Sequence, residues 1–193
     1  MPLNLVVVTP PAEEPVTIAQ VKAQTRVEHT ADDALIAVYL SAARELCEEM
    51  ARRAFVTQTL RLSLDEWPCG RVIKLPRPPL ISVTSIVYTD DDGVATTWPA
   101  ANYVVDTDSE PGRILPDPDS TWPLGETLRA AGGIKITYQA GYGAAAVCPK
   151  KYQMAVLLLA AHLYERREAA ADAKMEEIPF GVTALLSGDK GWH

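Results

Sequence analysis

The chain contains 193 residues, of which 48% are hydrophobic and 22% are charged, and its formal net charge is −7. This length and composition are sufficient for one hydrophobic core with at most a small second module. The acidic balance argues against a surface that binds nucleic acid by neutralising phosphates with clustered Lys and Arg, although DNA can pass an acidic surface without binding to it.

The three cysteines, Cys47, Cys69 and Cys148, show no C-x-x-C spacing, so we expect reduced thiols in a cytosolic protein. The first residues, MPLNLVVVTPP, lack the positive region and the cleavage site of a signal peptide. The apolar run from Met154 to Tyr164 is much shorter than the ~20 residues that a transmembrane helix needs. We therefore expect no membrane segment.

The longest segment with a helical period runs from Thr30 to Ala54 and predicts a helix. Thr30 and Asp33 form a helix-start signature, because the hydroxyl can cap an unpaired amide and the carboxylate lies at the positive end of the helix dipole. The apolar positions cover roughly 200° of the helix surface, so the helix needs at least two partners, in its own chain or in a neighbouring copy. These positions are Leu35, Tyr39, Ala42, Leu46 and Met50, together with Ile36, Ala43, Cys47 and Ala54. The remaining face is expected to be solvated and carries Asp33, Ser41, Arg44, Glu48 and Arg52.

Two shorter elements precede this helix. The β-branched run Leu5 to Val8 is stopped by two prolines, so it is either an edge strand or an arm that pairs with another element. Thr17 begins the sequence T-I-A-Q, a capping box in which Gln20 reaches back to the cap. A short helix therefore follows Thr17 and ends near Val27.

The period changes from helical to alternating after Phe55, which predicts about seven short antiparallel strands. The strongest is Ser82 to Thr89, followed by a turn at Asp90 to Gly93 and by the hairpin partner Val94 to Trp98. The other predicted strands are Thr59–Leu64, Val72–Leu75, Tyr103–Val105, Arg113–Leu115 and Ile134–Tyr138.

A second long helix begins at Pro149 and is apolar nearly all round from Tyr152 to Tyr164, so we expect it to be buried against the first. The sequence thus predicts an α+β fold, a helical bundle with an inserted antiparallel β module. The expected bundle core consists of Leu35, Tyr39, Leu46, Met50, Leu157 and Leu163. The expected division is an arm (1–16), a helical bundle (17–56 and 147–170), a β module (57–146) and a C-terminal docking tail (171–193).

No constellation of residues indicates an enzyme, a cofactor or a metal site. Asp90 to Asp92 lack the spacing of a calcium loop and read as a hairpin turn. A Cys47–His162 hydrolase pair remains possible, but core packing explains both residues better. The aromatic residues of the strand region fit a sheet core better than a glycan-stacking face; they are Trp67, Trp98, Tyr103 and Trp122.

The order of the segments carries a family resemblance. The segments are T-I-A-Q-V-K-A-Q-T-R-V, D-D-A-L-I, A-A-R-E-L-C-E-E, F-V-T-Q-T-L, L-P-R-P-P-L, S-V-T-S-I-V-Y, A-G-Y-G, the second long helix with A-H-L-Y-E-R-R-E, and I-P-F-G-V-T-A-L-L. From Thr17 to Leu186 the chain resembles the head-to-tail connector, or adaptor, proteins of tailed bacteriophages and related gene transfer agents.

The resemblance implies a ring of about twelve copies in the virion neck, assembled in the bacterial cytoplasm. The ring would lie beneath the portal protein and above a stopper or tail-completion protein, and would line the channel through which double-stranded DNA leaves. The residues expected to dock on the portal are Ile178, Phe180, Val182, Leu185, Leu186 and Trp192. Truncation after Glu177 is expected to leave a folded protein that no longer joins portals. The alternatives are a stopper or tail-completion ring and a glycan- or receptor-binding β module.

Overall fold

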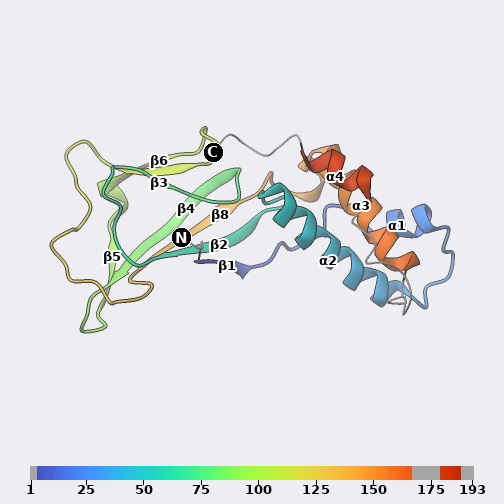
Figure 1. Cartoon of the computed structure of the whole chain (residues 1–193), viewed down its shortest axis with the longest axis horizontal. Coiled ribbons are helices and arrows are strands. Elements are labelled where there is room, and N and C mark those ends of the chain that lie inside the picture. Colours follow the sequence, from blue (N-terminus) through green and yellow to red (C-terminus); the bar gives the residue numbers. More distant parts are fainter. Residues whose placement is uncertain (1–3, 167–178, 188–193) are drawn as a thin grey trace. The chain divides into compact units, whose positions relative to one another are not determined.

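The computed structural model describes residues 4–166 and 179–187, and it confirms the α+β fold (Figure 1). The chain forms two compact units. The β unit comprises Met1–Ala12 and Thr57–Gly141, and the helical unit comprises Glu13–Val56 and Tyr142–His193. None of the described helices is long and apolar enough to cross a membrane.

The larger sheet of the β unit has five antiparallel strands in the order β1-β2-β8-β4-β5. Its strands are β1 (Asn4–Thr9), β2 (Gln58–Leu64), β8 (Ile134–Ala140), β4 (Leu80–Thr89) and β5 (Ala95–Trp98). The predicted alternation in β2 is confirmed, since Leu60 and Leu62 are buried while Arg61 is half-buried. Of the two alternatives for Leu5 to Val8, the structure shows an edge strand, because β1 pairs with β2 along Asn4 to Thr9.

The smaller sheet has three strands in the order β3-β7-β6. These are β3 (Ile73–Lys74), β7 (Arg113–Pro116) and β6 (Tyr103–Asp106), and the 3-10 helix η1 (Ala100–Asn102) leads into β6. Asp106 ends β6 and holds the following turn, because its carboxylate accepts from the Ser109 hydroxyl and from Arg113 Nε, each at 2.7 Å. These bonds favour the ionised carboxylate and lower the pKa of Asp106 to about 2.

The predicted hairpin turn between β4 and β5 is confirmed. Gly93 has a φ of +84°, and the Asp90 carboxylate accepts from the Val94 N–H at 2.7 Å. The first acidic residue therefore stabilises the turn from within, and the glycine supplies the positive φ that the turn requires.

The core of the β unit contains a cluster of tryptophans. The ring centroids of Trp67 and Trp122 are 5.2 Å apart and those of Trp98 and Trp122 are 5.1 Å apart, and Tyr103 stacks on Trp98. Trp67, Trp98 and Trp122 are 5–6% exposed, which confirms the prediction that they belong to the sheet core. These three rings offer no open face on which a sugar ring could stack.

The helical unit contains α1 (Ile18–Thr25), α2 (Asp33–Ala51), the 3-10 helix η2 (Ala145–Val147), α3 (Lys150–Glu165) and α4 (Phe180–Ser187). The capping box at the start of α1 is confirmed: the Gln20 N–H donates to Thr17 Oγ1 (3.2 Å) and the Thr17 N–H donates to Gln20 Oε1 (2.7 Å). The expected cap of α2 at Thr30 is wrong. The cap residue is Asp32, whose carboxylate instead accepts from the Tyr164 hydroxyl at 2.6 Å and so ties the start of α2 to the end of α3.

Candidate functional site: the helical unit and its exposed faces

The bundle core lies on a different stripe of α2 from the predicted one. Leu35 and Leu46 are 37% and 39% exposed, so their assignment to the core of the single chain is wrong. The buried seam of α2 consists of Ile36, Leu40, Ala43, Cys47 and Ala51. Three of these side chains are small, which allows α3 to approach α2 closely and turns the bulkier stripe outward.

Four other residues predicted for the bundle core lie at its edge. They are partly buried and pack against the core cluster: Tyr39, Met50, Leu157 and Leu163. Tyr39 meets Tyr164 edge to face with 6.5 Å between ring centroids. Within the core, the rings of Phe55 and Tyr152 stack with their centroids 4.4 Å apart.

A buried ion network was missed by the sequence reading. Arg44 is 4% exposed and Glu48 is fully buried, although both were expected on a solvated face. The Arg44 guanidinium donates to Glu48 Oε2 (3.0 Å) and to Glu14 Oε2 (2.8 Å). Burial alone would lower the pKa of Arg44, but the charges of Glu14 and Glu48 hold that pKa above its ordinary value. The network ties the segment before α1 to the middle of α2.

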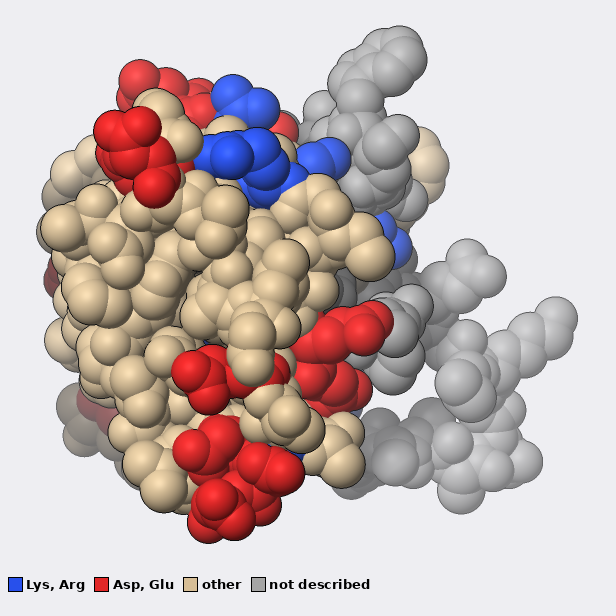
Figure 2. All heavy atoms as spheres, turned by 90° about the vertical axis from the view of Figure 1, so that its left-hand side faces the viewer, with Lys and Arg blue, Asp and Glu red and all other residues tan. Residues whose placement is uncertain are grey.

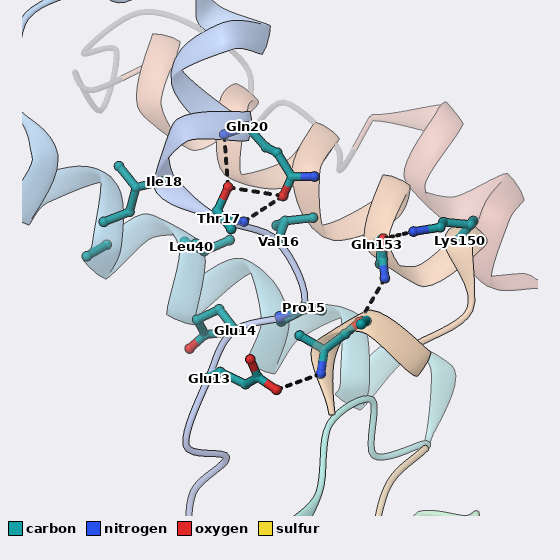
Figure 3. A pocket seen from close by; sticks show the side chains of 13 residues that line it. Glu13, Glu14, Pro15, Val16, Thr17, Ile18, Gln20, Leu40, Lys150 and Gln153 are labelled. Carbon is teal, nitrogen blue, oxygen red and sulfur yellow. Dashed lines mark hydrogen bonds between the residues drawn. The ribbon is translucent and has the colours of Figure 1, made fainter. Parts of the chain in front are cut away.

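A pocket of 530 Å³ opens beside this network (Figure 3). Its apolar wall includes Val16, Ile18 and Leu40. Its polar groups bind one another: Glu13 accepts from the Ala145 N–H at 2.8 Å, and Lys150 donates to Gln153 at 3.0 Å. The pocket therefore presents no converging set of free catalytic groups.

The predicted docking tail is divided between two environments. Val182 and Leu186 are buried in the bundle core, where α4 lies beside α3, and Leu185 packs partly against it (Figure 1). Phe180 is 87% exposed. Ile178 and Trp192 lie outside the described residues. Thus α4 is held to the bundle by one face and presents an aromatic side chain on another.

The two cysteines of the helical unit are buried thiols. Burial, with a contribution from Glu48, raises the pKa of Cys47 to about 12, and the same causes raise the pKa of Cys148 to about 11. A nucleophilic cysteine needs the opposite shift, toward the thiolate. The core explanation of Cys47 is therefore the better one.

Acidic side chains predominate at one end of the β unit. Figure 2 faces the end at which β5 lies and shows several groups of Asp and Glu, whereas Lys and Arg are fewer and gather mainly near the top of the view. Exposed acidic residues of this unit include Asp91, Asp92, Asp119 and Glu126. Within residues 4–166 and 179–187, no group of three or more His, Cys, Asp or Glu side chains could hold a metal ion.

Chains in solved structures of gene transfer agent particles resemble this chain over nearly its whole length. A chain of the virion of a native gene transfer agent particle is 28% identical with a TM-score of 0.79, and the match covers 98% of this chain and 96% of that one. A chain in the neck of a native particle, computed with C12 symmetry, is 29% identical with a TM-score of 0.72, and the match covers 100% of this chain and 97% of that one.

A third structure, the neck of an empty gene transfer agent particle computed with C6 symmetry, is 30% identical over 98% of this chain and 96% of that one, with a TM-score of 0.77. No protein-family model and no curated protein sequence matches the chain. The identity and the coverage from end to end show that the chain belongs to the family of structural neck proteins of gene transfer agent particles.

Proposed function

We propose that the chain is the head-to-tail adaptor subunit of a virion neck. In this role about twelve copies form a ring beneath the portal protein, join it to the next neck or tail-completion component, and line part of the channel through which DNA leaves. The observation that carries the proposal is the match, over 98% or more of this chain, to chains of gene transfer agent particles and necks, one of them computed with C12 symmetry.

The helix α4 supports the portal contact. Val182 and Leu186 fix α4 on the bundle, so Phe180 is carried on an anchored helix rather than on a free tail. A large aromatic side chain that is almost fully exposed on an anchored helix is typical of an anchor for a partner surface. The acidic surface supports the channel role, since it repels the DNA backbone and leaves the genome free to slide.

Phe180 allows a sharper test than truncation of the tail. Removal of residues after Glu177 would also remove two core side chains, so lost portal binding would not separate docking from folding. We expect Phe180→Ala to weaken co-purification with the portal at least tenfold, while Thr183→Ala, an exposed change on the same helix, keeps it. Equal portal binding by both variants would remove α4 from the portal contact.

A stopper or tail-completion ring is the second candidate, because it shares the ring architecture. It differs in its neighbours. A stopper would join a preformed portal–adaptor complex and ignore the isolated portal, whereas the adaptor binds the isolated portal directly.

A further inference from the structure

We propose that neighbouring copies in the ring meet through two different faces of the helical unit. One is the outer α2 stripe, defined as Leu35, Val38, Glu45, Leu46 and Glu49. The other is the α3 entry patch, defined as Val147, Lys150, Lys151 and Met154. The inference rests on the ring assembly proposed above and assigns its copy-to-copy interface.

The outer α2 stripe is an apolar surface that the chain leaves uncovered. Leu35, Val38 and Leu46 are 37%, 64% and 39% exposed, at spacings of three and eight residues that keep them on one side of the helix. Glu45 and Glu49 border them, both exposed. A helix face of this kind is costly in water and is typical of a surface that another subunit covers.

The α3 entry patch combines apolar and basic side chains at the start of α3. Val147 and Met154 are 64% and 47% exposed, and Lys150 and Lys151 are exposed beside them. Two lysines oppose the positive end of the helix dipole, so their position costs the isolated chain some stability. Among the described residues, neither Lys150 nor Glu49 forms a salt bridge; Lys150 donates to the uncharged side chain of Gln153 at 3.0 Å, so neither charge has a counter-charge in the described part of its own chain.

The two faces point away from the seam between α2 and α3. At about 100° per residue, Val38 lies roughly 200° around α2 from the buried Ile36, and Met154 lies roughly 200° around α3 from the buried Tyr152. Because the buried seams face each other, the exposed faces lie on broadly opposite sides of the helical unit. A contact between two such faces is heterologous, the kind of interface that a ring of more than two copies requires.

Charge selects this pairing over the pairing of either face with itself. An acidic-bordered stripe against a second acidic-bordered stripe places like charges together, as does one lysine patch against another. The stripe against the patch places Glu45 and Glu49 near Lys150 and Lys151 of the next copy. The charges on the two faces therefore favour a contact between the outer α2 stripe of one copy and the α3 entry patch of the next.

Cross-linking tests the pairing directly. The variant Leu46→Cys with Met154→Cys carries one thiol on each face; Cys69→Ser removes the exposed native thiol, while Cys47 and Cys148 are buried. Neck-containing particles that have incorporated the full-length variant are treated with a short bismaleimide. We expect a ladder of covalent oligomers reaching the ring size, because every copy links to two neighbours.

The single-cysteine proteins are the matched controls. Each alone should give no covalent oligomer, and a mixture of the two in one particle should give dimers without a ladder. Dimers from Leu46→Cys alone would show that α2 stripes pair with each other and would overturn the proposal. A double variant that is incorporated at normal copy number yet gives no ladder would also overturn it, which includes the case in which another part of the same chain covers the stripe.

Incorporation separates this inference from the adaptor function. If the wild-type chain were not incorporated into necks at all, this would contradict the proposed function, and the interface proposal would fall with it.

Charge reversal tests the same contact independently. Glu49→Lys or Lys150→Glu alone should lower the incorporation of the chain into necks at least tenfold, and the two changes together should restore incorporation. Failure of the double reversal to recover any assembly would contradict the contact between these two faces.

Discussion

Glu48 accepts a hydrogen bond from the backbone N–H of Phe55 at 2.7 Å, across the end of α2. The same carboxylate binds Arg44 at 3.0 Å through its other oxygen. The fully buried Glu48 side chain therefore binds both the Arg44 guanidinium on α2 and the backbone of the turn that follows this helix.

Replacement of Glu48 is predicted to destabilise the helical unit strongly. Glu48→Ala leaves the Arg44 guanidinium buried with one fewer counter-charge and leaves the Phe55 N–H without its acceptor, so the free energy of unfolding should fall by about 3–5 kcal/mol. Urea denaturation followed by far-UV circular dichroism measures this loss. The matched control Glu45→Ala removes the exposed acidic partner of the same guanidinium: Glu45 contacts Arg44 at 3.2 Å but is 68% exposed, so its loss should cost less than about 0.5 kcal/mol. Similar losses in the two variants would contradict the structural role of the network.

The three thiols are predicted to differ sharply in reactivity. Cys69 is exposed, whereas burial raises the pKa of Cys47 to about 12 and that of Cys148 to about 11. Because only the thiolate reacts, a native-state assay with a chromogenic disulfide at pH 8 should detect one fast thiol, which Cys69→Ser abolishes. Both buried thiols have raised pKa values in the folded chain, so their contribution to stability is full below pH 9 and declines as the pH rises toward 11 and 12. Three equally fast thiols would show that the bundle core is open.

Asp106 is predicted to contribute to the loss of the free energy of unfolding at low pH. Hydrogen bonds from Ser109 and Arg113 lower the pKa of this carboxyl from its ordinary value to about 2. A depressed pKa stabilises the fold above the unfolded value and loses that effect as the pH falls from about 4 to about 2. Asp106→Asn should reduce the slope in this window, whereas Asp108→Asn, an exposed change of the same charge, should not. Chemical denaturation between pH 2 and pH 6 provides the comparison, and identical slopes for both variants would refute the assignment.

The two faces of α4 are predicted to separate stability from binding. Leu186→Ala removes a core side chain and should lower the free energy of unfolding by about 2–5 kcal/mol. Phe180→Ala changes an exposed side chain and should alter it by less than about 0.5 kcal/mol. Thermal or urea unfolding of both variants checks this difference. A large loss of unfolding free energy in Phe180→Ala would mean that the aromatic ring of Phe180 packs against the rest of the chain instead of facing outward.

Much of the β unit is readable from local patterns. The alternation of Leu60 and Leu62 predicts β2, and the Asp90 to Gly93 turn predicts the β4–β5 hairpin, because both depend on neighbours in sequence. The packing of the helices is less readable. The apolar arc of α2 is wide enough to contain two faces, and only the position of α3 decides which one is buried.

Two further features depend on contacts that local patterns do not encode. Arg44 and Glu48, four residues apart, resemble an ordinary surface pair in the sequence. In the fold, Arg44 donates to the Glu14 carboxylate and Glu48 accepts from the Phe55 N–H, and neither partner follows from the local pattern of α2. The apolar residues near the C-terminus resemble a docking tail in the sequence. Val182 and Leu186, however, are four residues apart, so they lie on one face of α4, and this face is buried in the bundle core. In both cases the partner that decides the outcome lies far away in the sequence.

Native mass spectrometry of the full chain, alone and mixed with its isolated portal, tests the adaptor function most directly. The account predicts a complex in which a fixed number of copies, about twelve, add to one portal ring, and in which Phe180→Ala lowers the occupied fraction. A chain that leaves the portal unbound, whatever its own oligomeric state, would contradict the adaptor function.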